Sequence, residues 1–265
     1  MNSKSYKGKK YSKGNFPEVD DLLTVEESLK ITINQAPFTV TMRTPGHEAE
    51  LVRGLLFSEN VYTDLISHPV IAVKEKNNSG TVTWMDVAIP ADKIGKGFGI
   101  TRSIASVSSC GVCGKTELQE SSSAPLSATG EQLYPELVGK MFSQMSSKQE
   151  LFKKSGGSHA CAAFSQEGKM LSIREDIGRH NAVDKVIGDL IIQKKLSQAR
   201  CLTVSGRISY EIVNKCFAAG IPFLASVSAP SSLAVDMAEQ MGITLLAFCR
   251  DKKFTVYSHS SRIKI

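Results

Sequence analysis

The second half of the chain alternates strand-like and helix-like segments, and this alternation restricts the folds open to it. The expected order is strand, helix, strand, helix, strand, over residues 201–204, 208–219, 223–227, 233–241 and 243–248. Gly220 and Gly242 follow the two helical segments, where glycine commonly ends a helix. Strands separated by helices form a parallel or mostly parallel sheet with helices on its faces. We therefore predict an α/β fold for this half.

Earlier segments of this half fit the same fold. Pro135 and the apolar residues after it predict a helix over 135–147, and the apolar face from Val183 to Ile191 predicts another. Residues 161–164 and 170–173 are predicted to pair as a hairpin across a turn at 166–168.

The first half of the chain is richer in strands. Alternating apolar residues predict a hairpin over 30–42 and two strands over 70–74 and 81–89. Thr44 and Pro45 predict a helix start, since threonine caps helices and proline suits the first helical position. We predict a smaller β-rich α+β domain over residues 15–118, a serine-rich linker over 119–133 and the α/β domain over 134–265.

The formal net charge of +6 is concentrated at the N-terminus, where residues 1–14 hold five lysines and no acidic residue. We predict that this basic segment is a disordered tail, and the nearly neutral remainder argues against a nucleic-acid partner. No apolar run approaches the roughly 20 residues that span a bilayer, and no apolar signal core follows the lysines. We therefore expect a cytoplasmic protein with no membrane partner.

Three turns in the C-terminal half share a chemistry that suits anions. They lie at residues 175–180, 205–209 and 228–232, each directly before a predicted helix. Backbone N–H groups at helix N-termini attract anions, and arginine adds paired donors. The sequence contains neither a nucleotide-hydrolase loop nor a dinucleotide-binding glycine motif. We predict a crevice for an anionic ligand, formed by Arg179, His180, Ser205, Arg207, Ser228 and, on the same rim, Arg250.

Two histidines near these turns are candidates for proton transfer or for purely structural roles. His180 lies at a helix N-terminus with Asp184 one turn later, a spacing that lets the carboxylate orient the imidazole. His159 follows two glycines, at positions 156 and 157, that allow close approach of a ligand to the backbone. The spacing does not define a catalytic triad.

Cys110 and Cys113 form a Cys-x-x-Cys motif, with a glycine after each thiol and Lys115 close by. A structural zinc site needs four ligands, and the sequence supplies one such pair. A dithiol oxidoreductase places its motif at a strand-to-helix junction, whereas this motif precedes a polar linker. The remaining chemistry is covalent carriage of sulfur as a persulfide on a thiolate. No permanently bound metal is expected. The other four cysteines stand singly in apolar segments and are predicted to be buried: Cys161, Cys201, Cys216 and Cys249.

Several motifs together resemble the FdhD family, the formate dehydrogenase accessory sulfurtransferases. They occupy residues 43–48 (with Gly54), 109–114, 156–160, 175–185, 205–207, 226–230 and 248–250. The run Glu-Asp-Ile-Gly-Arg-His-Asn-Ala-Val-Asp-Lys at 175–185 is highly specific. The resemblance covers the chain from about residue 29 to residue 257.

The resemblance implies a cytidine deaminase-like α/β fold for the C-terminal domain, and a homodimer. It implies that persulfide sulfur is taken from a cysteine desulfurase and transferred to Mo-bis(molybdopterin guanine dinucleotide), bound as a substrate, for the activity of formate dehydrogenase. The family pattern assigns the persulfide to Cys110, with Cys113 in support. It assigns cofactor contact to the stretch made of Phe248, Cys249, Arg250, Asp251, Lys252 and Lys253.

Two alternatives to sulfur transfer remain open on the sequence. A binding chaperone would hold the cofactor without chemistry, and a zinc-bridged dimer would use one cysteine pair from each subunit. Deamination is not expected, because the zinc motif of deaminases needs a glutamate two residues after its first ligand. The nearest candidate, His159-Ala160-Cys161, lacks it.

Overall fold

The computed structural model describes residues 2–99, 124–127 and 131–264 of the chain. Its C-terminal half contains a six-stranded sheet in the order β12-β11-β10-β9-β7-β8. The strands are β7 (His159–Phe164), β8 (Met170–Asp176), β9 (Cys201–Val204), β10 (Phe223–Ser226), β11 (Thr244–Arg250) and β12 (Lys253–Val256). Strands β9, β10 and β11 run parallel, whereas β7, β8 and β12 run antiparallel to their neighbours. The predicted α/β fold is confirmed, but the sheet is mixed and not mostly parallel, since only the β9–β10 and β10–β11 pairings are parallel.

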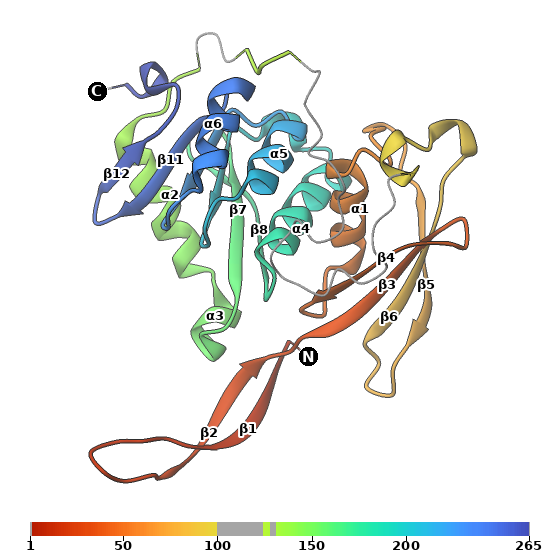
Figure 1. The fold of residues 1–265 in the computed structure, drawn as a ribbon, viewed down its shortest axis with the longest axis vertical. Coiled ribbons are helices and arrows are strands. Elements are labelled where there is room, and N and C mark those ends of the chain that lie inside the picture. The colour runs from red at the N-terminus through yellow and green to blue at the C-terminus, as the bar shows by residue number, and fades with distance from the viewer. Residues whose placement is uncertain (1, 100–123, 128–130, 265) are drawn as a thin grey trace.

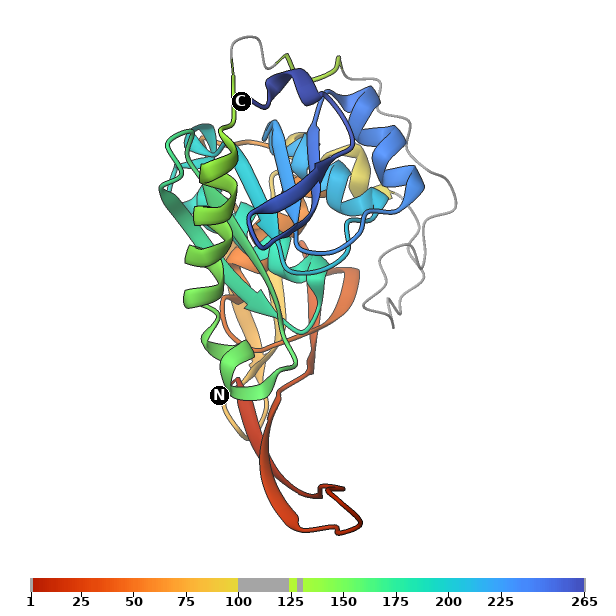
Figure 2. The ribbon, with the colours of Figure 1, turned by 90° about the vertical axis from the view of Figure 1, so that its left-hand side faces the viewer.

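Helices cover both faces of this sheet. They are α2 (Pro135–Ser147), α3 (Glu150–Ser155), α4 (Arg179–Ile192), α5 (Tyr210–Ala218) and α6 (Ser232–Met241). Apolar residues of α2 pack on one face, and those of α4, α5 and α6 pack on the other. Figure 2 shows α2 on the side of the sheet away from α5 and α6. No helix in the described parts of the chain combines the length and the apolar character that crossing a bilayer requires.

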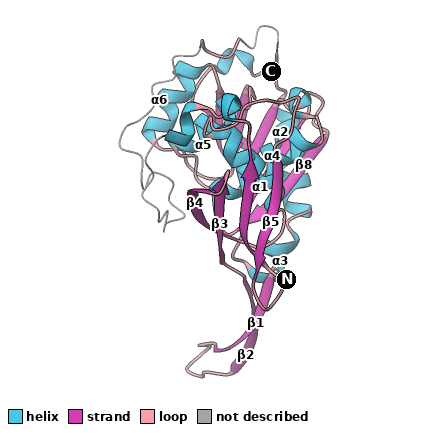
Figure 3. Cartoon of the chain, turned by 90° about the vertical axis from the view of Figure 1, so that its right-hand side faces the viewer, coloured by secondary structure: helices cyan, strands magenta, loops and turns pink. Residues whose placement is uncertain are grey.

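The N-terminal half forms a four-stranded sheet in the order β4-β3-β6-β5, as the strand pattern predicted. Its strands are β3 (Glu27–Ile33), β4 (Ala36–Arg43), β5 (Val70–Lys76) and β6 (Val82–Ala88). Helix α1 (Glu48–Ser58) lies between this sheet and α4 (Figures 1 and 3). Its residues Leu51, Val52 and Leu56 are fully buried against the sheet.

The prediction of a disordered tail over residues 1–14 is wrong. Strand β1 (Ser3–Lys9) pairs with β2 (Glu18–Thr24), and the hairpin extends away from the rest of the molecule (Figures 1 and 2). The register places Lys7 opposite Asp20 and Lys9 opposite Glu18, so opposite charges face each other across the strands. The acidic residues that pair with these lysines lie after residue 14. The prediction considered only the first fourteen residues and therefore missed them. This pairing also crosses the domain boundary predicted at residue 15.

The expected helix start at Thr44 is also wrong, because α1 begins at Glu48. The Thr44 hydroxyl accepts a hydrogen bond from the N–H of Ile177 in the C-terminal half (3.0 Å) instead of capping a helix. Gly46 and His47 then turn the chain with φ of 98° and 61° before the helix begins.

Candidate functional site

The carboxyl edge of the six-stranded sheet brings together five separate segments of the chain. Because β9, β10 and β11 are parallel, the residues after these strands lie at one edge. Strand β7 begins there and β8 ends there, since each is antiparallel to its neighbour. The residues at this edge are His159, Asp176 to His180, Ser205 to Arg207, Val227 to Ser228, and Arg250. The predicted turns therefore do meet.

Small hydroxyl side chains hold these turns together. The Ser205 hydroxyl accepts a hydrogen bond from the N–H of Ala160 (2.9 Å) and lies 3.5 Å from Nδ1 of His159. The buried Ser226 hydroxyl donates to the carbonyl of Gly206 (2.6 Å) and accepts from the N–H of Ser228 (2.9 Å). Ser205 therefore already has a structural partner at this edge.

Two of the three predicted arginines, Arg179 and Arg207, lie close enough to His159 to act on its charge. Arg207 is exposed and Arg179 is half-buried, with its Nε atom enclosed and without a hydrogen-bond partner among the described residues. Burial lowers the pKa of His159, and the positive charges of Arg179 and Arg207 lower it further. Arg179 and Arg207 therefore place positive charge beside an imidazole whose protonated form is disfavoured.

His180 is held by partners other than the one that the sequence predicted. Its Nε2 lies 3.2 Å from the hydroxyl of Ser209 and 3.7 Å from a carboxylate oxygen of Glu211. Asp184, expected to orient this imidazole, instead accepts from Ser58 and from the buried Lys215, both at 2.8 Å.

The stretch that the resemblance assigns to cofactor contact covers the end of β11, the turn at Asp251 and Lys252, and the first residue of β12. Phe248, Asp251 and Lys252 have φ of 56°, 53° and 58°, so the turn is held in the left-handed region. Arg250 donates to the carbonyl of Val227 (2.9 Å), which ties this turn to the edge. Residues of the turn and of α2 line a pocket of about 690 Å³.

Cys249 differs from its neighbours in this turn. Its side chain packs in the apolar core between the sheet and α2, where the residue is 4% exposed. Burial raises the pKa of its thiol to about 12, so it stays protonated. Cys161, Cys201 and Cys216 are buried as well, which confirms the prediction for these four cysteines.

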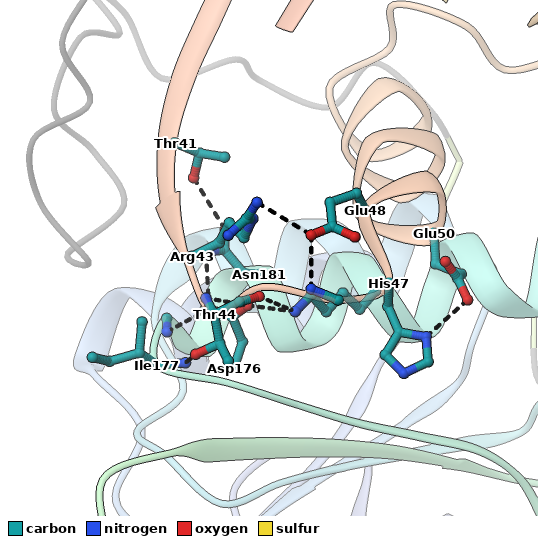
Figure 4. Close-up of polar contacts among 12 residues, drawn as sticks. Thr41, Arg43, Thr44, His47, Glu48, Glu50, Asp176, Ile177 and Asn181 are labelled. Atoms are coloured by element: carbon teal, nitrogen blue, oxygen red, sulfur yellow. Dashed lines mark hydrogen bonds and ion pairs between the residues drawn. The ribbon is translucent and has the colours of Figure 1, made fainter. Parts of the chain in front are cut away.

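A buried polar network, which sequence reasoning missed, joins the N-terminal half to the turn before α4 (Figure 4). The Asp176 carboxylate accepts from Lys185 (2.7 Å) and from the N–H groups of Thr44 (3.1 Å) and Gly178 (2.8 Å). Lys185 also donates to the carbonyl of Thr44 (2.9 Å). Asp176 and Lys185 are almost completely buried. The family-like runs at 43–48 and 175–185 contain these residues, but a pairing across more than 130 positions leaves no local signal.

Cys110 and Cys113 lie outside the described residues. Among the residues that the structure does describe, no group of three or more His, Cys, Asp or Glu side chains is placed to hold a metal ion. Two pockets lie along α2 beside this edge, one lined by the end of β11 and the other by His159 and Ser205.

Fold and edge together define a class of protein: an α/β protein with arginine, histidine and serine side chains at the carboxyl edge of its sheet, joined to a smaller β-rich half. The model of the FdhD/NarQ family matches residues 24–264, and the chain belongs to that family. A protein of Mycobacterium bovis called sulfur carrier protein FdhD is 44% identical over 92% of both chains. One of the same name from Saccharolobus solfataricus is 39% identical over 92% of this chain and 91% of its own.

A crystal structure supports the fold independently of these sequences. It is that of a protein from Desulfotalea psychrophila described as a formate dehydrogenase accessory protein. The two structures align over 100% of both chains with a TM-score of 0.76 and 24% sequence identity. At this identity the likeness shows the shared fold.

Proposed function

We propose that this protein is a sulfur carrier whose Cys110 accepts sulfur as a persulfide from a cysteine desulfurase. It then delivers that sulfur to Mo-bis(molybdopterin guanine dinucleotide), bound at the carboxyl edge, for use by formate dehydrogenase. The observation that carries the proposal is the match to relatives called sulfur carrier proteins over 92% of the chain. The exposed Arg207, with Arg179 and Arg250, supports it, because a cofactor with two dinucleotides carries several phosphates.

The chemistry balances with the two thiols, the donor persulfide and a thiol reductant. The Cys110 thiolate attacks the terminal sulfur of the donor persulfide, so that a new S–S bond forms while the donor's S–S bond breaks and its thiolate leaves. For delivery, the Cys113 thiolate attacks the Cys110 sulfur and releases hydrosulfide to the acceptor. The Cys110–Cys113 disulfide that forms balances the two-electron reduction of the sulfur, and a cellular thiol reductant restores it. Lys115 favours the thiolate forms.

Peptide mapping by mass spectrometry tests the carrier step. After incubation with a cysteine desulfurase and cysteine, we expect one added sulfur atom on the peptide that contains Cys110. The Cys110→Ala variant should lose this adduct, and the Cys113→Ala variant should keep it. The four buried cysteines are internal controls, since their thiols are enclosed and protonated. An adduct that survives Cys110→Ala contradicts the proposal. A Cys110→Ala protein that still supports active formate dehydrogenase indicates a binding chaperone instead.

Calorimetry with guanosine diphosphate tests the anionic edge. Replacing Arg207 with alanine removes an exposed charge-assisted donor, so we expect about tenfold weaker binding. The matched control is Arg200→Ala, because Arg200 immediately precedes β9 at the opposite end of the strand and pairs with Glu131 (2.9 Å). Unchanged affinity in Arg207→Ala removes this residue from the site.

The same proposal includes a homodimer in the cytoplasm, with the cysteine desulfurase and formate dehydrogenase as successive partners. It assigns no permanently bound metal to the protein. Metal analysis that finds one zinc ion per two chains would replace it with the zinc-bridged dimer.

A further inference from the structure

The β1–β2 hairpin projects from the rim of the carboxyl edge. The hydroxyl of Thr24, the last residue of β2, lies 2.6 Å from that of Ser155, the last residue of α3. A Cβ atom on Gly157 would lie 3.3 Å from the same Thr24 hydroxyl. Strand β7 begins two residues later at His159, so the base of the hairpin is fixed beside the candidate site. Figure 1 shows the hairpin continuing outward from the end of the molecule where α3 lies.

The hairpin carries large apolar side chains that are exposed to solvent. They are between 42% and 66% exposed and comprise Tyr6, Tyr11, Phe16, Leu22 and Leu23. Tyr11 and Phe16 at the tip are the most exposed of these, and their ring centroids lie 5.3 Å apart. Exposed apolar groups gathered on one element are typical of a surface that another molecule covers. A two-stranded hairpin without a core of its own is only marginally stable in water, so a partner would also stabilise it.

The tip holds this ring pair in a defined position. Lys13 and Gly14 have φ of 48° and 84°, and positive φ at both central residues is typical of the tight turn that suits a hairpin. Ser12 and Asn15, which flank these two residues, exchange two backbone hydrogen bonds (2.9 and 3.0 Å). A side-chain pair that is already positioned loses little conformational entropy on binding, and aromatic anchors dominate the energy of many protein interfaces.

The charge of the hairpin is balanced along the strands and positive at the tip. Two lysines of β1 face acidic residues of β2 across the strands. Residues 10–17 at the tip contain Lys10 and Lys13 and no acidic residue. Both lysines are exposed. The tip therefore complements a protein surface that combines an apolar groove with an acidic rim.

The position of the hairpin indicates which partner meets it. A carrier that loads a bulky cofactor has to pass it on to the enzyme that uses it. That enzyme must approach the carboxyl edge, where the proposed function places the cofactor. A strand of seven residues spans roughly 20 Å, so the tip lies well outside this edge, where a protein that docks there would meet it.

We propose that the hairpin is a docking arm for the protein that receives the loaded cofactor, and that Tyr11 and Phe16 enter an apolar groove with an acidic rim on that protein. In the proposed function this protein is formate dehydrogenase, so the inference rests on the proposed function. The two rings supply the apolar contact, and Lys10 and Lys13 pair with the rim. The arm takes no part in the sulfur chemistry at Cys110 or in binding the cofactor.

Surface plasmon resonance with the full chain and purified, cofactor-free formate dehydrogenase tests this proposal. We expect Tyr11→Ser/Phe16→Ser to weaken binding about tenfold, because the change removes both aromatic anchors. Both side chains are exposed, so their loss leaves the core intact. Lys10→Glu/Lys13→Glu should slow association several-fold and reduce its dependence on salt, since charges at the rim of an interface act mainly on the rate of encounter.

The matched control is Leu65→Ser/Ile66→Ser, which removes two exposed apolar side chains from the N-terminal half and should bind as wild type does. Size-exclusion chromatography with light scattering tests whether the hairpin serves a second copy of this chain instead. A change from dimer to monomer in Tyr11→Ser/Phe16→Ser overturns the proposal. Wild-type affinity of that variant, an equal loss in the control, or no binding by the wild-type protein overturns it as well.

Persulfide formation on Cys110 and binding of guanosine diphosphate are separate readouts, which Tyr11→Ser/Phe16→Ser should leave unchanged. Their absence in the wild-type protein contradicts the proposed function. If both are present, and the affinity for formate dehydrogenase does not depend on Tyr11 and Phe16, only the docking arm is contradicted.

Discussion

Glu211 is the residue that most clearly joins stability to the candidate site. It lies in the first turn of α5, where the helix N-terminus favours a carboxylate, and its side chain lies beside His180. Burial opposes its ionisation, but hydrogen bonds with His180 and Ser209 outweigh burial and lower the pKa of Glu211 to about 2. The folded state therefore stabilises the ionised form of this side chain.

This stabilisation should depend on pH. A carboxyl group whose pKa falls from 4.5 to about 2 on folding stabilises the protein fully above pH 4.5 and loses that contribution as the pH falls toward 2. Wild type should have a higher free energy of unfolding than Glu211→Gln. This stability difference should be roughly 2 kcal/mol larger at pH 6 than at pH 3. Urea denaturation at both values measures this difference. The control for loss of a surface carboxylate is Asp236→Asn on the exposed face of α6, and a pH-independent difference between wild type and Glu211→Gln contradicts the assignment.

Of the three residues His180, Ser209 and Glu211, which contact one another, only His180 was identified from the sequence. His180 was predicted from its place before a helix, and that place is correct. Its partner was not, because the spacing rule that pointed to Asp184 treats one helix by itself. Ser209 and Glu211 lie at the start of α5, and the packing of α4 and α5 on the same face of the sheet brings the two helix starts together. The sequence predicted that the turns with Arg179 and Arg207 lie together, but it did not predict the strand order that brings them to one edge.

At the scale of elements, the contact between α1 and α4 depends on two glycines. A Cβ atom on Gly54 would lie 1.9 Å from the carbonyl oxygen of Asp184, and one on Gly188 would lie 1.8 Å from that of Glu50. These distances are far shorter than any real contact, so the two helix backbones approach as closely as they do because both positions lack a side chain.

Gly54→Ala should therefore force the two helices apart. We expect it to lower the free energy of unfolding by about 3 kcal/mol, since the clash is with backbone that cannot rotate away. Gly139→Ala on α2 is the matched control, because a Cβ atom there meets nothing within 4 Å. That change should stabilise the protein by about 0.5–1 kcal/mol through helix propensity. Denaturant unfolding measures both, and equal effects of the two substitutions contradict this account of the helix crossing.

Helices and strands with regularly spaced apolar residues could be predicted from the sequence. Elements whose pairing or bounds depend on residues far away in the sequence could not. The helix predicted over 135–147 coincides with α2, and the strand predicted over 201–204 coincides with β9. The β1–β2 hairpin has few buried apolar residues to mark it, and its pairing is visible only when lysines and acids on both strands are considered together. The start of α1 was missed because Thr44 bonds to the C-terminal half.

At the scale of the whole molecule, the two sheets share a buried interface. Helix α1 contributes Leu51 and Leu56 to the N-terminal core, whereas Phe57 of the same helix packs into the C-terminal core. Asn181 at the start of α4 donates to the carbonyl of Met42 (2.7 Å), and Asp176 and Lys185 both bond to Thr44. The sequence predicted two domains, but the residues that join them are polar side chains whose partners lie in the other half.

We expect the two halves to unfold together for this reason. Trp84 is the single tryptophan of the chain and lies in β6 of the N-terminal sheet, with its indole N–H donating to Thr32 (3.0 Å). Its fluorescence reports on that sheet, whereas far-ultraviolet circular dichroism reports mainly on the helices, most of which cover the C-terminal sheet. The two signals should give coincident urea transitions, as a cooperative unit requires. In the double variant Asp176→Asn/Thr44→Val, which cuts this polar network, the transitions should separate, with that of Trp84 at the lower urea concentration. Separate transitions already in wild type would show that each sheet is stable by itself and that the interface contributes little.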